Sequence, residues 1–346
     1  MKNLLFIDFT TFYGGGQKFI LNFHTHSKSP GRNHFIVSST KLFEALKTEN
    51  KLLLALAIKT WLKDVNTINS FIKNNNIDCV ILNGNRPIYG AAFIKANIKI
   101  AYRHTSHNAF SGLKKFLAPF FLNFSYLFCH YVVVLYYSAT KEVWFNKSKI
   151  RVINNGIPVP QTKKGSREDF KFIEFVTITR LELPKGLEWL INTFKNIDAG
   201  EIRIRLKIAG VGPDSEYLKQ LASGSKHPIV FLGFIDDVDK LLSTSDVFIL
   251  PSKFESFPLS VIEAMAVSLP IVASDTGGIE EMVAHNSNGF LVRYGCEKEL
   301  KHVLQSLAES RDLREVFGKK SCEIFKSRLT IQSNIQKIEE IINGQI

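Results

Sequence analysis

Short apolar segments alternate with helix-length segments along this chain, and the alternation occurs in two separate series. Such alternation predicts parallel β-sheets whose strands are joined by crossover helices. The strands predicted in the first series are 4–9, 34–38, 79–82, 98–102 and 131–136. Those predicted in the second series are 172–179, 205–209, 229–232, 247–250 and 270–273. Each series therefore predicts an α/β domain of the Rossmann-like type.

A turn-rich stretch at 154–166 separates the two series and is typical of a linker. With 346 residues, 45% of them hydrophobic, the chain can bury two cores of ordinary domain size, which excludes a disordered or fibrous protein. We predict an N-terminal domain at 1–160, which includes the start of the linker, and a C-terminal domain at 161–328. Two such domains predict a ligand site in a central cleft between them, at the carboxyl ends of the strands.

Two glutamates, Glu255 and Glu263, stand eight residues apart around a predicted helix start. Ser256 is the predicted N-cap, and Pro258 suits the first helical turn. The free N–H groups and positive dipole end of a helix N-terminus suit a diphosphate. A carboxylate in the adjoining loop can bind sugar hydroxyls, and Glu263 can accept from ribose hydroxyls. The alternative is a capped surface helix with two solvated acids.

This pair resembles the Glu-x7-Glu motif of the family 4 retaining glycosyltransferases, which are nucleotide-sugar enzymes of the two-domain GT-B fold. Further family landmarks occur in the expected order from Gly14 to Glu281, so the resemblance covers nearly the whole chain. It implies that the last stretch, 329–346, contains a helix that packs back on the N-terminal domain. The donor-binding loop and helix start implied by the resemblance are Ser256, Phe257, Pro258, Leu259 and Ser260.

The mechanism implied by the resemblance retains the anomeric configuration by front-face substitution, in which the leaving phosphate helps to deprotonate the incoming hydroxyl. Glu255 then positions the sugar and acts electrostatically instead of attacking it. Arg180 and Lys185 follow a predicted strand, where two cations can neutralise the charge of a leaving nucleoside diphosphate. By resemblance they match the diphosphate clamp. The alternative is two exposed basic side chains that flank a turn.

Three glycine-rich turns also follow predicted strands. Gly210 and Gly212 belong to a tight turn in which missing side chains let the backbone approach a ligand. Gly277 and Gly278 resemble a Gly-Gly-x-x-Glu turn that supplies amides to the donor, with the final glutamate bracing the next helix. The family often has proline at the position of Glu280.

The third of these turns is in the N-terminal domain. There Gly15 and Gly16 resemble the family's glycine-rich loop, and the triplet is not the G-x-G-x-x-G pattern of dinucleotide-binding proteins.

Three further residues are assigned by resemblance. Phe234 and Ile235 match the segment that frames the nucleotide base, with ordinary core packing as the alternative. His104 matches a histidine that points toward the donor sugar and binds one of its hydroxyls. The alternatives for this role are His107 nearby, or a histidine whose hydrogen bonds are satisfied within the fold.

The basic character lies entirely in the N-terminal half, because residues 1–160 carry a net charge of +14 and the remainder carries −2. Such a half-molecule predicts an anionic neighbour, either nucleic acid or a membrane surface. No nucleic-acid-binding module is recognised, so we predict no nucleic acid and favour an anionic membrane surface. The alternative is charge that only improves solubility.

Residues 116–140 contain no Asp, Glu, Lys or Arg, which is long enough for a membrane-spanning helix. Pro119 and Asn123 interrupt the segment, so we predict a helix followed by a strand. Core packing is predicted for most of its aromatic residues, with contact to lipid headgroups as the alternative. Four widely spaced cysteines, and a first segment too short for a secretory signal, predict a cytoplasmic protein, peripheral at the inner face of the plasma membrane.

The resulting hypothesis is a retaining glycosyltransferase that moves a sugar from a UDP- or GDP-sugar to a saccharide or lipid-linked saccharide acceptor. Envelope polysaccharide, lipopolysaccharide or capsule synthesis is the expected setting. No cofactor is expected and no metal, because the basic pair Arg180 and Lys185 can take the place of a divalent ion at the diphosphate. The alternatives are a nucleotide-sugar epimerase of the same fold and a non-catalytic nucleotide-sugar-binding protein.

Overall fold

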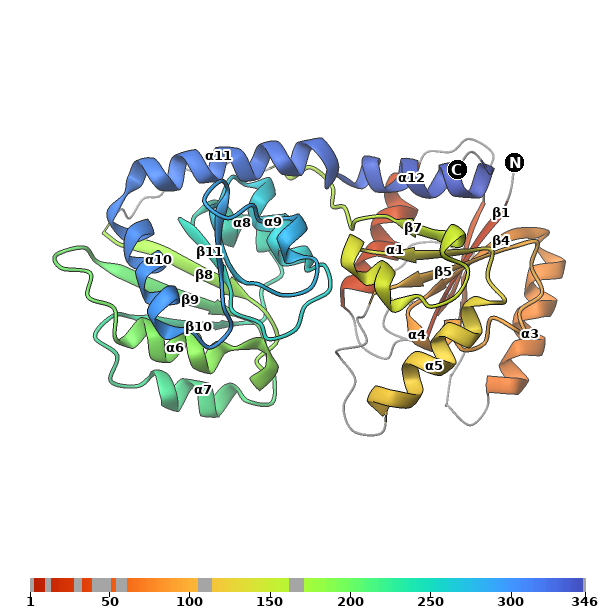
Figure 1. Cartoon of the computed structure of the whole chain (residues 1–346), viewed down its shortest axis with the longest axis horizontal. Helices are drawn as coiled ribbons and strands as arrows, with labels where there is room; N and C mark the ends of the chain where they lie inside the picture. The colour runs from red at the N-terminus through yellow and green to blue at the C-terminus, as the bar shows by residue number, and fades with distance from the viewer. Residues whose placement is uncertain are drawn as a thin grey trace. The chain divides into compact units, whose positions relative to one another are not determined.

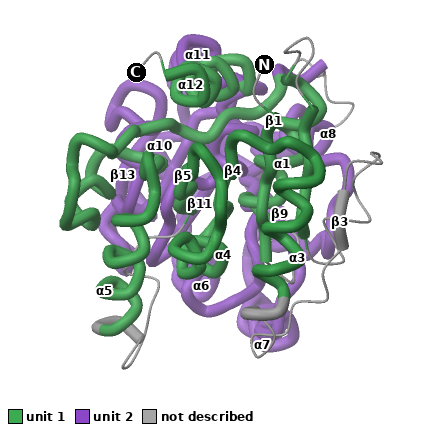
Figure 2. Tube along the Cα trace, turned by 90° about the vertical axis from the view of Figure 1, so that its right-hand side faces the viewer, with its two compact units in different colours: residues 1–158, 331–346 green, residues 159–330 purple. Residues whose placement is uncertain are grey.

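A computed structural model of the chain describes residues 3–9, 14–27, 33–38, 51–53, 61–104, 114–161 and 171–344. The chain divides into two compact units (Figures 1 and 2). Unit 1 comprises Met1–Pro158 together with Ile331–Ile346, and unit 2 comprises Val159–Thr330. The boundaries of the units lie within two residues of those expected at 160 and 328.

Within the described residues, unit 1 contains a seven-stranded sheet in the order β3-β2-β1-β4-β5-β6-β7. Every neighbouring pair is parallel. The strands are β1 (Asn3–Asp8), β2 (His34–Ser38), β3 (Lys51–Leu53), β4 (Ile77–Asn83), β5 (Ile98–Arg103), β6 (Tyr131–Val134) and β7 (Ile150–Val152). The two three-residue strands at the edges of the sheet were not predicted, because such short segments carry no periodic pattern.

Helices cover both faces of this sheet. They are α1 (Gly15–His26), α3 (Trp61–Asn74), α4 (Asn85–Ile88), α5 (Lys114–Tyr126) and α12 (Ile331–Asn343). Phe6 of β1 packs on α1 through Phe19 and Phe23, while Phe35 of β2 packs on α3 through Phe71. Since Phe6 lies beside Ile36 in the strand register, Phe35 points to the opposite face, and α1 and α3 cover opposite faces.

Helix α12 belongs to unit 1 although it ends the chain, and Figure 2 colours it with that unit. Ile331 N donates to the carbonyl oxygen of Ile157. Asn334 Nδ2 donates to the carbonyl oxygen of Asn154 at 2.7 Å, and Ser27 Oγ of unit 1 donates to Glu339. The apolar face of α12 is buried at Ile331, Ile335, Ile338, Ile341 and Ile342.

Unit 2 has a six-stranded sheet in the order β10-β9-β8-β11-β12-β13, again parallel throughout. Its strands are β8 (Ile173–Ile178), β9 (Ile204–Ala209), β10 (Ile229–Gly233), β11 (Val247–Leu250), β12 (Ile271–Ser274) and β13 (Gly289–Val292). Its helices are α6 (Leu187–Lys195), α7 (Ser215–Ala222), α8 (Val238–Ser243), α9 (Leu259–Ala266), α10 (Glu297–Glu309) and α11 (Arg311–Arg328). Strand β13 was not predicted.

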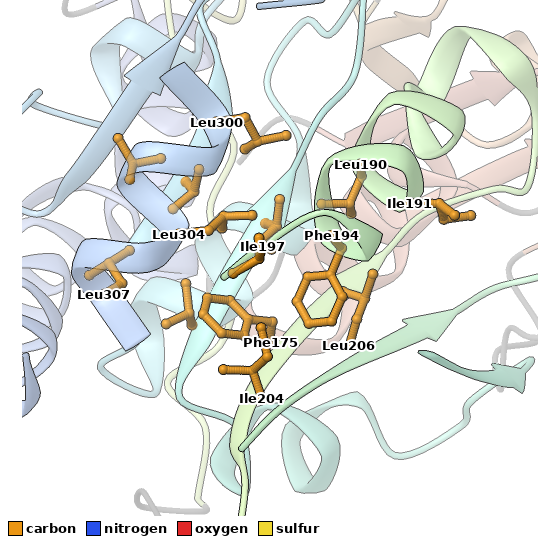
Figure 3. Close-up of a cluster of buried hydrophobic side chains, with 14 of the residues drawn as sticks. Phe175, Leu190, Ile191, Phe194, Ile197, Ile204, Leu206, Leu300, Leu304 and Leu307 are labelled. Atoms are coloured by element: carbon orange, nitrogen blue, oxygen red, sulfur yellow. The ribbon is translucent and has the colours of Figure 1, made fainter. Parts of the chain in front are cut away.

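Figure 3 shows the core on one face of this second sheet. Phe175 of β8 and Phe194 of α6 meet edge to face, with ring centroids 5.8 Å apart. Leu300, Leu304 and Leu307 of α10 close the cluster, spaced three and four residues apart so that they share one helix face. Each such fully buried side chain contributes about 1.5–3 kcal/mol. This core fixes α6 and α10 against the strands whose carboxyl ends carry the site.

The uncharged segment 116–140 forms α5 and then β6, a helix followed by a strand. No helix among the described residues has both the length and the apolar character needed to cross a bilayer. The prediction of core packing is wrong for Phe120, Phe121 and Phe124, whose side chains are 50–55% exposed. These three phenylalanines point outward because α5 buries its other face, with Leu122, Asn123 and Tyr126.

Candidate functional site

The strand order of the unit 2 sheet reverses between β8 and β11, while the strands themselves stay parallel. From β8 the chain passes through α6 to β9 on one side, whereas β11 lies on the other side of β8. Loops that leave neighbouring strands in opposite directions open a crevice at the carboxyl ends of a parallel sheet. The two loops at this point, 179–186 after β8 and 251–258 after β11, contain six of the residues singled out from the sequence: Arg180, Lys185, Glu255, Ser256, Phe257 and Pro258.

Lys185 and Glu255 meet across these two loops. Lys185 Nζ donates to Glu255 Oε1 at 2.8 Å, and the two side chains are 23% and 13% exposed. Arg180 lies in the first loop as well, is 59% exposed, and forms an ion pair with Glu182. The structure therefore brings the expected cation and the expected carboxylate into direct contact and leaves the guanidinium of Arg180 close to solvent.

Backbone hydrogen bonds join the loops around this ion pair. Lys253 N donates to the carbonyl oxygen of Pro184 at 2.9 Å, which links the loop after β11 to the loop after β8. Gly278 N donates to the carbonyl oxygen of Ser256 at 2.7 Å, which links the loop after β12 to the same assembly. Rigid backbone contacts of this kind preorganise a site before a ligand binds.

Close backbone approach explains the glycines. Gly277 adopts φ +61°, and a Cβ there would collide with the carbonyl oxygen of Glu255. Gly186 adopts φ +69°, and a Cβ there would collide with the carbonyl oxygen of Pro251. Cβ atoms at Gly210 and Gly212 would likewise collide with the loop after β8, at the carbonyl oxygens of Thr179 and Leu181.

The start of α9 differs from the prediction. Its N-cap residue is Pro258, with no side-chain cap, and Ser256 stands outside the helix with its carbonyl oxygen bound by Gly278. The helix begins at Leu259, followed by Ser260, so the first-turn N–H groups of α9 have no capping side chain. Phe257 and Glu263 are both buried. The alternative of two solvated acids is therefore wrong for Glu263, one turn into the helix.

The segment that follows Gly277 and Gly278 is the single 3₁₀ turn Ile279–Glu281, where a helix braced by Glu281 was expected. The Arg328 guanidinium of α11 binds the carbonyl oxygen of Glu281 and fixes this turn to the C-terminal end of unit 2. After β10, Phe234 is 71% exposed and Ile235 is half-buried. The core-packing alternative is thus wrong for Phe234, whose ring is free to contact a ligand.

A second cluster of polar side chains lies at the matching position of unit 1, where the strand order of the sheet reverses between β1 and β4. Asp8 ends β1 and is fully buried; its Oδ2 accepts from Gln17 Nε2 at 2.7 Å and from Asn83 Nδ2 at 2.5 Å. Asn83 ends β4, and its Oδ1 lies 2.6 Å from His104 Nε2. Burial lowers the pKa of His104 to about 4.

The sequence identified Gly15, Gly16 and His104 here but missed Asp8, Gln17 and Asn83. A signal was present, because Asp8 and Asn83 are polar residues that end two buried strands. Gly15 and Gly16 open α1, and a Cβ on Gly16 would stand 3.2 Å from Asn83 Nδ2 and 3.3 Å from His104 Cδ2. His107 lies outside the described residues. Gly16 thus has a packing role beside His104.

No group of three His, Cys, Asp or Glu side chains within the described parts of the chain is placed to hold a metal ion. The four cysteines are free thiols, with Cys79 and Cys129 buried.

The chain is similar to known glycosyltransferases. Residues 159–323 match the family model of the glycosyl transferases group 1. An uncharacterized glycosyltransferase of Methanocaldococcus jannaschii is 39% identical over 132 residues, which are 37% of this chain and 33% of that protein. An uncharacterized glycosyltransferase of Haemophilus influenzae is 29% identical over 262 residues, 71% of each chain. The chain thus spans about a third of the length of the first relative.

Among solved structures, HepE of Anabaena in complex with UDP superimposes with a TM-score of 0.85 at 19% identity, over 99% of this chain and 100% of that one. The two Rossmann-like units and this likeness define a GT-B fold, as predicted. The family model of the glycosyl transferases group 1 covers unit 2 almost from end to end.

Proposed function

We propose that the protein is a glycosyltransferase that uses a nucleotide diphosphate sugar as donor. The observation that carries this proposal is the Lys185–Glu255 pair at the reversal point of the unit 2 sheet, beside the uncapped start of α9. A cation, free helix N–H groups and a partly exposed carboxylate at one place match a diphosphate joined to a sugar.

Each residue has a role in this proposal. Lys185 and Arg180 neutralise the diphosphate as the sugar leaves, for which Arg180 exchanges Glu182 for the phosphate. Glu255 binds donor sugar hydroxyls, and Glu263 accepts from the ribose. The exposed ring of Phe234, with Ile235, stacks against the base. His104 of unit 1 binds a sugar hydroxyl.

The reaction retains the anomeric configuration, and the leaving phosphate takes the proton of the incoming hydroxyl. The two cations supply the charge stabilisation that a divalent ion provides in other transferases. Activity is therefore expected to persist in EDTA. Transfer abolished by EDTA and restored by Mg²⁺ or Mn²⁺ would contradict this part of the proposal.

UDP is the favoured nucleotide, because the structural neighbour HepE is a complex with UDP. Calorimetric titration of the wild-type protein with UDP, GDP and ADP tests the donor site directly. Selective binding of one nucleotide, weakened in Arg180→Ala, supports the proposal and fixes the base. No binding of any of the three contradicts it.

The proposed acceptor is a saccharide or lipid-linked saccharide of the bacterial envelope. Support comes from a relative in Escherichia coli, 25% identical over 217 residues, that is named as a galactosyltransferase acting on a diphosphoundecaprenol-linked sugar. A product analysis with lipid-linked and free saccharides distinguishes the reaction from epimerisation, which needs no acceptor, and from binding without turnover.

We also place the protein in the cytoplasm, at the inner face of the plasma membrane, through a surface of unit 1. Helix α5 exposes four apolar side chains, Leu117, Phe120, Phe121 and Phe124, and Leu127 directly after the helix is exposed as well. A hollow of about 480 Å³ lies between this helix and Tyr89. Lys149 sits at the end of the helix, its Nζ 2.8 Å from the carbonyl oxygen of Cys129. Apolar side chains beside a lysine fit an anionic bilayer.

Flotation with vesicles of phosphatidylglycerol, and with vesicles of phosphatidylcholine alone, tests this surface. The wild-type protein is expected to float with the anionic vesicles, and Phe120→Ser with Phe124→Ser is expected to prevent it. Val316→Ser is the matched control, since Val316 is 62% exposed on α11 of unit 2. Equal flotation of the double variant and the wild type would exclude α5 as the membrane contact.

A further inference from the structure

Four polar side chains form one hydrogen-bonded chain at the reversal point of the unit 1 sheet. Gly14 N donates to Gln17 Oε1 at 2.9 Å, which turns the amide nitrogen of Gln17 toward Asp8. Asp8 Oδ2 accepts from both Gln17 and Asn83, and Asn83 then contacts His104. The chain thus runs from a buried carboxylate to the imidazole ring.

The orientation of the Asn83 amide is fixed by two acceptors on the same side. Asn83 Nδ2 lies 2.5 Å from Asp8 Oδ2 and 3.3 Å from the carbonyl oxygen of Gly16. A flipped amide would place its oxygen against a carboxylate oxygen and a carbonyl oxygen, which repel it. The amide oxygen of Asn83 therefore faces the other way, toward His104 Nε2.

This orientation determines where the imidazole carries its proton. An amide oxygen only accepts, so the Nε2 atom 2.6 Å away from it has to donate. In a neutral ring the other nitrogen, Nδ1, then has no proton and presents a lone pair. Nδ1 has no hydrogen-bond partner among the described residues. His104 Nδ1 also does not belong to the fully buried side-chain atoms that lack a hydrogen-bond partner.

The ring is held by packing as well. Its centroid lies 5.7 Å from the ring of Phe19 and 5.0 Å from the ring of Tyr102, and Gly16 leaves no side chain in the space beside it. Phe19 and Tyr102 stack on each other with centroids 4.3 Å apart, so both rings pack on the same side of the imidazole. With that side packed and Nε2 bonded to Asn83, Nδ1 is the ring nitrogen left to bind a ligand.

We propose that Asp8 and Asn83 are positioning residues that hold His104 as the Nε2–H tautomer, so that Nδ1 accepts a hydrogen bond from a hydroxyl of the transferred or accepting sugar. The inference rests on the proposed function only for the identity of the ligand. The tautomer itself is a property of the free protein. The proposal predicts that the site rejects a deoxy sugar that lacks the hydroxyl bound by His104 Nδ1.

Nitrogen NMR of ¹⁵N-histidine-labelled protein at neutral pH tests the tautomer without any substrate, with His104→Gln to assign the signals. The wild-type ring is expected to be neutral and protonated on Nε2. In Asn83→Ala the two tautomers are expected to mix. Asn69→Ala is the matched control, an asparagine on α3 that also donates to a backbone carbonyl oxygen. A wild-type ring protonated on Nδ1, or on both nitrogens, would overturn the proposal.

A charge swap tests the chain further, and it shows a result that a merely structural role would not give. Asn83→Asp alone keeps an acceptor against Nε2 but places two carboxylates face to face, so a rise in the His104 pKa is expected while Nε2 stays protonated. Adding Asp8→Asn removes one carboxylate and restores a donor opposite the other, so the His104 pKa is expected to fall again. A His104 pKa in Asn83→Asp equal to the wild-type value would overturn the proposal.

Turnover of UDP-glucose, by transfer or hydrolysis, links the tautomer to activity. Asn83→Ala is expected to lower kcat about tenfold, as for one lost hydrogen bond, while UDP affinity measured by calorimetry is unchanged. A normal kcat in a variant with mixed tautomers would overturn the role of Nδ1. Failure of UDP to bind the wild type would instead contradict the proposed function and leave the tautomer result standing.

Discussion

Lys185 Nζ lies 2.8 Å from Glu255 Oε1, although 70 residues separate the two in the sequence. The contact joins the loops that follow β8 and β11, the two strands between which the strand order of the unit 2 sheet reverses. A cation already paired with a carboxylate is held in place before the diphosphate arrives, so less ordering has to accompany binding.

Lys185→Ala is therefore expected to weaken UDP binding by about 10- to 100-fold, the effect of losing one charged hydrogen bond. Calorimetry measures this loss. Lys320→Ala is the control, because Lys320 also pairs with a glutamate, Glu323, on the surface of α11. Equal UDP affinity in Lys185→Ala and Lys320→Ala would show that Lys185 does not touch the nucleotide.

The contact between Gly277 and Glu255 leads to a second prediction. Gly277→Ala forces a side chain into φ +61° and into the carbonyl oxygen of Glu255. Left-handed backbone alone costs about 1–2 kcal/mol, and the collision moves the loop that carries Glu255. Both thermal stability and UDP affinity are expected to fall.

Gly200→Ala separates the two causes, since Gly200 has φ +54° and no atom within 4 Å of an added Cβ. It is expected to lose stability by the backbone cost alone, with UDP affinity unchanged. A Gly277→Ala protein that binds UDP as tightly as Gly200→Ala does would exclude Gly277 from the donor site.

The lowered pKa of His104 makes the free energy of unfolding depend on pH. Its folded pKa of about 4 lies below the ordinary value of 6.5 because burial disfavours the charged ring. Between these values the unfolded chain binds the proton and the folded chain does not. Stability from this group is complete above pH 6.5 and decreases on acidification toward pH 4, by at most about 1.4 kcal/mol per pH unit.

Denaturant unfolding of the wild type and of His104→Gln at pH 7, 6 and 5 measures this contribution. The wild type is expected to lose more stability than the variant on acidification, because glutamine does not titrate. His24, whose pKa is also lowered by burial, is present in both proteins and cancels. Parallel pH profiles would mean that His104 is not buried as a neutral ring.

The strands of the two sheets follow from the sequence wherever an apolar run is long enough. Buried parallel strands are apolar on both faces, so β4 and β11 are recognisable as runs. Strands β3 and β7 have only three residues, and β13 has an apolar run of only three after Gly289, so their pairing depends on neighbours that a local pattern does not contain. The outward direction of the α5 aromatics was missed for the same reason.

The site was predictable in its residue types and less so in its contacts. Lys185 and Glu255 were each identified, yet only the order of the strands brings them together. Ser256 was wrongly predicted as a cap, because the backbone of Gly278 occupies its carbonyl oxygen and draws it out of the helix. Asp8 and Asn83 were missed because each stands alone in the sequence at the end of a strand.

The last helix provides a test of how the chain is divided. Ile338 of α12 is buried in unit 1, so Ile338→Ala is expected to destabilise that unit by about 2–5 kcal/mol. Hydrogen exchange followed by mass spectrometry is expected to show lost protection in α1 and β5, with β8 unchanged. Gln332→Ala, exposed on the same helix, is expected to leave both units unchanged. Lost protection in β8 to the same extent as in β5 would contradict the assignment of α12 to unit 1 alone.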